Sequence, residues 1–311
     1  MTQTIPFGSR STADKVLAGV DLTGKQIVVT GCNSGIGFET MSALCANGAR
    51  VIGLARSLRD AEIACAKAGP STTAMACDLS DLDSVAHAAD AIRALKTPLD
   101  CIVANAGIAN LPRLRTRYGV ELQFLVNHIG HFALVNELMG SVRNGSGRIV
   151  IVSSSAATTQ APAEGIMFDN LDGHRFYKPL TFYGQSKLAN ALFAKELSRR
   201  VSARGIVVNS LHPGVTRGTG LNRAAALPLK IVLSAARPFM RSAPRAAATQ
   251  ALLAASPSVA GITGQYWANC QIAAGNPLLD DADLANRLWD LSAQIVALHT
   301  TAHPKAMQEA A

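Results

Sequence analysis

The chain has 311 residues, of which 49% are hydrophobic and 16% charged, so it can bury a large core, and its composition argues against intrinsic disorder. Aromatic residues make up only 5%, which argues against a stacking surface for single-stranded nucleic acid. The formal net charge of +8 would suit a polyanion, but it fits equally well a site for an anionic cofactor beside a solvated basic surface.

The six cysteines, Cys32, Cys45, Cys65, Cys77, Cys101 and Cys270, form neither a C-x-x-C pair nor a Cys/His cluster. We therefore expect no metal site and no disulfide framework, as suits a reducing compartment. Residues 1–20 lack the continuous apolar stretch of a signal peptide, and no run of about 20 apolar residues follows. These features predict a cytoplasmic protein with no membrane span.

Short apolar runs alternate with longer Ala- and Leu-rich stretches along the chain. After an N-terminal arm over residues 1–24, the predicted strands are 26–30, 50–55, 72–77, 100–104, 148–153 and 206–211. The predicted helices are 35–47, 81–95, 118–142 and 183–203. Strands that are apolar throughout and alternate with helices are typical of a parallel sheet covered on both faces.

The pattern therefore predicts an α/β Rossmann fold, with a doubly wound parallel sheet of about seven strands and helices on both faces. No linker or repeat divides the chain, so we expect a single catalytic domain over 25–300 and a tail over 301–311. Residues 215–255 are expected to form helices outside the sheet.

A glycine-rich loop, "VVTGCNSGIGFET", follows the first predicted strand and opens a helix. Gly31 permits a tight turn, Gly35 allows backbone to approach a pyrophosphate, and Gly37 allows the helix to pack close to the strand. The helix N-terminus offers free N–H groups to phosphates. A glycine triplet alone is weak evidence for nucleotide binding, but its position between a strand and a helix indicates a dinucleotide site.

The end of the second predicted strand bears on the choice of cofactor. "VIGLARS" contains no acidic residue for a ribose hydroxyl, whereas Arg56 follows the strand directly. A guanidinium suits a 2′-phosphate, so we expect NADP(H) to be preferred, with NAD(H) possible. The alternative is that Arg56 is an ordinary surface residue.

"TFYGQSKLAN" places Tyr183 and Lys187 four positions apart, on one face of a predicted helix. Most such pairs are a packed phenol beside a solvated ammonium. A chemical interpretation is that the cation lowers the pKa of the phenol, which otherwise lies near 10, and makes it usable as an acid–base group.

Together these segments resemble the short-chain dehydrogenase/reductase family, over roughly residues 21–297. Further matching segments are "CDLSDL" (77–82), "ANAG" (104–107), "ELQFLVNHIGHF" (121–132), "RIVIVSSSA" (148–156) and "LHPG" (211–214). "VNHIGHF" and "GQYWANCQ" are similar to the retinol-dehydrogenase-like and WW-domain-oxidoreductase-like branch.

The resemblance implies an NADP-dependent oxidoreductase acting on CH–OH groups. Tyr183 matches the acid–base residue and Lys187 the residue that binds the nicotinamide ribose. Ser154 matches the residue that binds the substrate oxygen, with Ser153 and Ser155 as alternatives, and Asn127 matches the residue of the proton relay. Implied cofactor contacts are Gly31, Asn33, Ser34, Gly35, Ile36, Gly37, Arg56, Asp78, Leu79, Asn105, Ala106, Gly107, Tyr183, Lys187, Pro213, Gly214 and Thr216.

Three departures from the family pattern stand out. Ser154 and Tyr183 are 29 positions apart (183 − 154), so the intervening insert is expected to form part of the substrate wall. Ala104 replaces the first residue of a double-Asn motif. Gly218 stands where a Thr or Ser often contacts the carboxamide, which leaves Thr216 or Thr219 open.

The resemblance also implies a substrate lid within 215–255 that closes over a lipophilic alcohol or carbonyl compound, and a homodimer or homotetramer. Neither nucleic acid nor a metal is an expected partner. His128, His131 and His212 are interpreted as packing residues, and the basic stretch 199–245 as a solvated face. The alternative function is a sensor or scaffold protein that binds NADP(H) without turnover.

Overall fold

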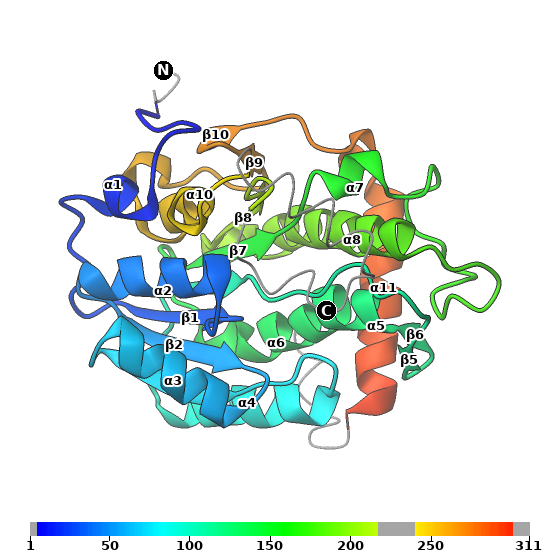
Figure 1. Cartoon of the computed structure of the whole chain (residues 1–311), viewed down its shortest axis with the longest axis horizontal. Coiled ribbons are helices and arrows are strands. Elements are labelled where there is room, and N and C mark those ends of the chain that lie inside the picture. Colours follow the sequence, from blue (N-terminus) through cyan, green and yellow to red (C-terminus); the bar gives the residue numbers. More distant parts are fainter. Residues whose placement is uncertain (1–4, 217–239, 301–311) are drawn as a thin grey trace.

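The central sheet lies between two layers of helices in the computed structural model, which describes residues 5–216 and 240–300 (Figure 1). The described residues form an eight-stranded sheet in the order β10-β9-β8-β7-β4-β1-β2-β3, in which only β10 runs antiparallel to its neighbour. The strands are β1 (Gln26–Thr30), β2 (Arg50–Ala55), β3 (Thr72–Ala76), β4 (Cys101–Ala104), β7 (Arg148–Val152), β8 (Val207–His212), β9 (Tyr266–Ala268) and β10 (Gln271–Ile272). A separate hairpin joins β5 (Thr116–Arg117) to β6 (Val120–Glu121).

The helices divide between the two faces of the sheet. The principal ones are α1 (Ala13–Leu17), α2 (Gly35–Ala46), α3 (Leu58–Ala68), α4 (Leu82–Ala94), α5 (Leu122–Phe124), α6 (Gly130–Leu138), α7 (Ala156–Thr159), α8 (Pro179–Arg200), α10 (Ala243–Ala255) and α11 (Ala282–His299). A π-helical turn, η1 (Leu125–Ile129), joins α5 to α6. Short 3-10 turns span Met139–Ser141, Ser202–Arg204, Pro257–Val259 and Pro277–Asp280.

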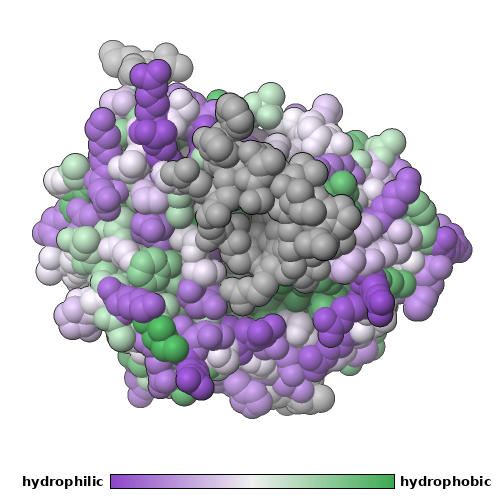
Figure 2. Space-filling view, in the orientation of Figure 1, coloured by the Kyte–Doolittle hydropathy of each residue, from purple (hydrophilic) through white to green (hydrophobic). Residues whose placement is uncertain are grey.

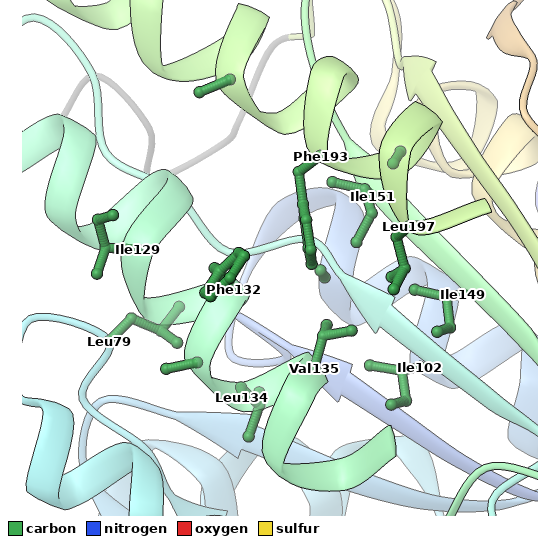
Figure 3. Packing of buried hydrophobic residues seen from close by; sticks show 14 of the residues in the cluster. Leu79, Ile102, Ile129, Phe132, Leu134, Val135, Ile149, Ile151, Phe193 and Leu197 are labelled. Atoms are coloured by element: carbon green, nitrogen blue, oxygen red, sulfur yellow. The ribbon is translucent and has the colours of Figure 1, made fainter. Parts of the chain in front are cut away.

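Alternate residues along each strand supply the two cores. The register aligns Ile52, Val28, Ile102, Ile149 and Val208 in a row across five strands, and all five belong to the core beneath α4, α6 and α8. Figure 3 shows the ring of Phe132 from α6 and that of Phe193 from α8 above these strands. The intervening residues, such as Val29 and Val103, pack in the opposite core with α1, α2 and α10. Both faces are apolar because both are covered.

The predicted doubly wound parallel sheet is confirmed, and the six predicted strands coincide with β1, β2, β3, β4, β7 and β8 to within about a residue. The sequence pattern does not predict β9 and β10, which have three and two residues respectively. Runs this short carry almost no periodicity.

The predicted helix over 118–142 is wrong in its first part. The β5–β6 hairpin reaches Glu121, and α5, η1 and α6 then follow one another. The side chain of Glu121 accepts from the amides of Gln123 and Phe124 and so caps the helix start. The predicted helix over 183–203 begins four residues earlier, at Pro179, which is favoured in a first helical turn.

The N-terminal arm packs onto the domain. α1 lies against α10 and α2, as Figure 1 also shows. The side chain of Gln271 donates to the carbonyls of Ile5, at 3.1 Å, and Phe7, at 2.5 Å. Of the expected lid region 215–255, residues 217–239 lie outside the described residues, as does the tail 301–311. α10 packs on the sheet beside β7 and β4.

Hydrophilic side chains cover most of the described surface on the face in Figure 2, and apolar side chains there form small separate areas. Among the helices of the described residues, none has the length and hydropathy needed to cross a membrane.

Candidate functional site

Most of the residues implied in chemistry or cofactor binding follow the carboxyl ends of parallel strands. The glycine loop follows β1, Asn105 follows β4, Ser153 to Ser155 follow β7, and Pro213 follows β8. Parallel neighbours end at the same edge of a sheet, and β1, β4, β7 and β8 are consecutive in it. The fold therefore brings these segments together at the usual ligand-binding edge of an open α/β sheet.

The glycine loop turns tightly beneath the start of α2. Gly31 and Gly35 have positive φ values of 67° and 56°, which favour glycine. A Cβ on Gly37 would lie 2.3 Å from the carbonyl oxygen of Gly31, so any side chain there would displace the loop. Ser34 precedes α2 without a side-chain capping bond, which leaves the first-turn amides of this helix for a ligand. Asn33 is exposed and Ile36 is half-buried beside them.

Asn105 fixes this loop to its neighbours. Its amide nitrogen donates to the carbonyl of Thr30 at 2.9 Å, and its carbonyl oxygen accepts from Gln250 of α10 at 3.0 Å. The hydroxyl of Thr30 accepts from the backbone amides of Asn105 and Ala106, each at 2.9 Å. The segment from Asn105 to Gly107 is thus held against the glycine loop by side chains of two other elements.

Arg56 and Asp78 lie beyond β2 and β3. The Arg56 side chain is exposed, just before the cap of α3 at Ser57. The carboxylate of Asp78 accepts from the amide and the hydroxyl of Ser80, at 2.9 and 2.7 Å, so it is held in place. The side chain of Leu79 is 6% exposed and packs in the core, so a cofactor contact from this residue would come from its backbone.

The three consecutive serines after β7 have different environments. The hydroxyl of Ser153 is buried and donates to the carbonyl of Lys187 at 2.6 Å. Ser155 is exposed and precedes α7. Ser154 is the serine whose hydroxyl acts on the phenol of Tyr183 and lowers its pKa; the same hydroxyl accepts from the amide of Ala156 at 3.2 Å. Of the three alternatives left by the sequence, the structure places Ser154 beside the phenol.

Burial dominates the protonation of Tyr183 and Lys187. It raises the pKa of Tyr183 to about 12, the Ser154 bond acting in the opposite direction, and it lowers the pKa of Lys187 to about 8. The ammonium lies 5.9 Å from the centre of the Tyr183 ring. The sequence predicts that the Lys187 charge lowers the pKa of the phenol. In the structure it is Ser154 that lowers this pKa, and the effect of burial, which raises it, is larger.

Asn127 is buried in η1 next to Lys187. Its side chain accepts from the amide of Ile108 at 2.8 Å and donates to the carbonyl of Ile108 at 3.0 Å and to Ser186 at 2.9 Å. A Cβ on Gly107 would lie 3.0 Å from the Asn127 side-chain oxygen and 3.4 Å from the Lys187 nitrogen. Gly107 therefore lies directly beside both groups.

Pro213 and Gly214 form a turn after β8. Gly214 has a φ of 89°, and the side chain of Arg241 lies against it, 2.6 Å from where a Cβ would be. The Thr216 hydroxyl donates to the Gly214 carbonyl at 3.0 Å. Thr219, the alternative carboxamide contact, lies outside the described residues. His212 accepts from the amide of Ser155 through Nδ1 at 3.1 Å, and burial lowers its pKa to about 4.

Several residues of the site were not assigned there from the sequence. Gln250 and Arg241 carry no motif of their own and reach the site only through the fold, whereas Thr30 lies within the quoted glycine-loop segment but was given no role from the sequence. Tyr266, on β9, donates from its hydroxyl to the carbonyl of Ser154 at 3.1 Å, and Tyr183 is close enough to add to the rise of its pKa, which burial brings to about 12. The segment "GQYWANCQ", already singled out in the sequence, was the available signal.

The arrangement suits a dinucleotide. Free amides at the start of α2, a glycine cradle and an exposed guanidinium match phosphate chemistry. Across the described ranges, no group of three His, Cys, Asp or Glu side chains is arranged to hold a metal.

Comparison with known proteins agrees with this geometry. A family model described as short chain dehydrogenase matches residues 25–167. The chain is 36% identical to human WW domain-containing oxidoreductase, over 93% of this chain and 72% of the relative. It is 36% identical to human retinol dehydrogenase 14, over 88% of this chain and 87% of the relative. A crystal structure of a short chain dehydrogenase from Burkholderia cenocepacia J2315 in complex with NADP superimposes with a TM-score of 0.63 at 28% identity, over 79% of this chain and 96% of that one.

Proposed function

Because this chain belongs to the short-chain dehydrogenase/reductase family, enzymes that act on CH–OH groups, we propose that it transfers a hydride between NADP(H) and the alcohol/carbonyl pair of a lipophilic small molecule. The observation that carries the proposal is the grouping of the half-buried Ser154 with the buried side chains of Tyr183 and Lys187. A phenol beside a hydroxyl, with an ammonium 5.9 Å from the centre of its ring, is a proton donor already in position.

In the reductive direction, Ser154 holds the carbonyl oxygen of the substrate and Tyr183 donates a proton to it. The bound dinucleotide supplies the hydride from its nicotinamide ring. Lys187 and the segment around Asn127 return a proton to Tyr183. Tyr183 with a pKa of about 12 is fully protonated at neutral pH, which suits it as an acid in reduction.

The preference for NADP(H) rests on Arg56. An exposed guanidinium after β2, with no acidic residue at the strand end, suits a phosphate on the adenosine ribose. A structural relative bound to NADP supports the same choice. Asp78, whose carboxylate is held by Ser80, is proposed to contact the adenine, and Pro213, Gly214 and Thr216 to border the nicotinamide.

The remaining proposals concern the surroundings of the site. A lipophilic substrate is supported by a relative named retinol dehydrogenase. A cytoplasmic location remains a prediction. A homodimer or homotetramer formed through the helices of Asn127 and Tyr183 also remains a prediction. In the single chain, α11 packs across both helices, and its Trp289 contacts Phe132 and Phe193.

The test follows NADPH oxidation against carbonyl compounds from small aldehydes to retinal-like and steroid-like ketones. Tyr183→Phe should abolish turnover and keep NADPH affinity. Tyr118→Phe is the control, because Tyr118 lies in the turn between β5 and β6, where its half-buried ring stacks on that of His299. Undiminished turnover by Tyr183→Phe would refute the mechanism. Tight NADPH binding with no turnover by the wild type would favour the sensor or scaffold alternative.

A further inference from the structure

His131 adds a second link between two parts of the site that the Asn127–Ile108 hydrogen bonds also connect. Its ring is fully buried in α6. Nδ1 lies 2.9 Å from the backbone carbonyl oxygen of Asn127, and Nε2 lies 2.8 Å from the hydroxyl of Thr30. One contact reaches the proton-relay side of the site and the other reaches the strand end that opens the glycine loop.

The partners of the ring determine its tautomer. A carbonyl oxygen can only accept, so Nδ1 must carry a hydrogen. Burial lowers the pKa of His131 to about 4, the nearby Lys187 charge adding to the effect, so the ring is neutral and Nε2 is an acceptor. The Thr30 hydroxyl therefore donates to Nε2.

This direction completes the bonding of Thr30. Its oxygen already accepts from the amides of Asn105 and Ala106. Its single hydrogen has two possible acceptors, His131 Nε2 at 2.8 Å and the carbonyl of Val103 at 3.5 Å, and the shorter contact is the stronger. An acceptor at Nε2 thus orients the hydroxyl so that its lone pairs face the Asn105–Ala106 amides.

The other end of the ring acts on a widened turn of helix. In η1 the amide of Gly130 bonds to the carbonyl of Leu125, five residues back, instead of four. Such turns displace backbone carbonyls from the usual helical ladder and are common at functional sites. The His131 hydrogen fixes the direction of the Asn127 carbonyl within this turn.

We propose that His131 is a positioning residue. Its two hydrogen bonds fix the Asn127 carbonyl relative to the Thr30 hydroxyl, which in turn holds the Asn105–Ala106 turn. The proton relay therefore keeps its position relative to the cofactor segment. The role of the relay rests on the proposed function; the hydrogen-bonded link itself does not. His131 touches neither the substrate oxygen nor the phenol, so it acts through Asn127 and Thr30.

His128 provides the contrast within the same chain. It is equally buried and lies in η1, but its Nε2 pairs with Ser292 on α11, and its ring packs between Phe124 and Phe193. His128 therefore stabilises helix packing, and its ring bonds to Ser292 and Asn190 and not to the Asn127 carbonyl or the Thr30 hydroxyl. His128→Phe is the matched control for a merely structural loss.

The link is tested first without activity, by ¹⁵N–¹H spectroscopy of the histidine-labelled protein, with His131→Asn assigning the signal. The expected result is a neutral ring with the hydrogen on Nδ1 throughout pH 5 to 9. A ring that protonates near its ordinary pKa of about 6.5, or that carries the hydrogen on Nε2, would overturn the proposal even if the wild type turned over no substrate.

With an active wild type, the second readout is the solvent deuterium isotope effect on kcat. His131→Phe should lower kcat roughly tenfold and enlarge the isotope effect, because proton return becomes slower, while KM for NADPH changes less than about threefold. His131→Asn keeps a donor near the Nδ1 position but loses the acceptor for Thr30, so it should recover only part of kcat. His128→Phe should lower the melting temperature and leave the isotope effect unchanged. Equal isotope effects in His131→Phe and the wild type, or equal losses in both Phe variants, would refute the positioning role.

Discussion

The side chains of Lys187 and Asn190 donate to the same atom, the backbone carbonyl oxygen of Val152, each at 3.0 Å. The carbonyl therefore keeps a partner if the ammonium is removed. Lys187 itself is buried, and no carboxylate in the described residues forms an ion pair with it. The charge is thus retained at a cost in stability, which is usual where a group serves function.

Lys187→Met should stabilise the protein at pH 7 while abolishing turnover. The folded-state pKa of about 8 lies below the reference value of 10.5, so below pH 8 folding must bury a charge. Removing it should raise the free energy of unfolding by on the order of 1 kcal/mol or more. The unfolded state binds more protons between pH 8 and 10.5, so wild-type stability rises there and the advantage of the variant should vanish by pH 10.5.

Urea unfolding at several pH values measures this difference. Lys195→Met serves as control, because Lys195 lies on the same helix but its side chain is 29% exposed and paired with Asp280. A Lys187→Met protein that is less stable than the wild type at pH 7 would contradict the buried-charge account.

The three serines after β7 should respond differently to alanine. Ser154→Ala removes the hydroxyl beside Tyr183 and should lower kcat roughly 100-fold with little change in stability. Ser153→Ala removes the bond to the Lys187 carbonyl and should mainly lower the melting temperature. Ser155→Ala should resemble the wild type. If Ser155→Ala showed the large kinetic loss instead, the register of the site would be wrong by one residue.

A pair of glycines tests the close packing of the phosphate loop. Gly37→Ala would place a Cβ 2.3 Å from the Gly31 carbonyl oxygen, and we expect a loss of roughly 1–3 kcal/mol in stability together with weaker NADPH binding. Gly140→Ala, where nothing lies within 4 Å of the added atom, should be silent in both respects. Thermal melting with and without NADPH reports both quantities, and an unaffected Gly37→Ala protein would disprove the cradle.

Arg56→Gln tests the choice of cofactor. Loss of a charge-assisted contact with the 2′-phosphate should weaken NADPH binding roughly tenfold to a hundredfold and leave NADH binding unchanged. Lys67→Gln, an equal charge change at the far end of α3, should alter neither affinity. Direct titration of each nucleotide gives the dissociation constants. If Arg56→Gln lost affinity for NADPH and NADH to the same extent, the guanidinium would not recognise the 2′-phosphate.

The sequence predicts the sheet well because buried parallel strands are apolar along their whole length, as in β1 and β2. It fails where local patterns are weak or interrupted. α3 and α11 have mixed polar and small residues and were not identified, and η1 interrupts a segment whose apolar residues otherwise suggest one long helix. Tertiary packing decides these elements.

The residues of the candidate site were likewise predicted where a local pattern marks them and missed where tertiary contacts place them. Gly31, Tyr183 and Lys187 were found because their spacing in sequence reflects a local structure, a turn or one face of a helix. Thr30 and Gln250 support Asn105 through contacts between distant segments, which no local pattern records. His131 was interpreted as a packing residue, because neither the Asn127 carbonyl nor the Thr30 hydroxyl can be seen from the sequence.

The bond between Gln250 and Asn105 also bears on how the protein is made. It spans 145 positions, and the bond from Thr40 to the same glutamine spans 210. During synthesis, β1, the glycine loop and Asn105 leave the ribosome before α10 does. The bond from Gln250 to Asn105 can therefore form only after α10 has emerged, and the bond from Tyr266 to the Ser154 carbonyl only later still.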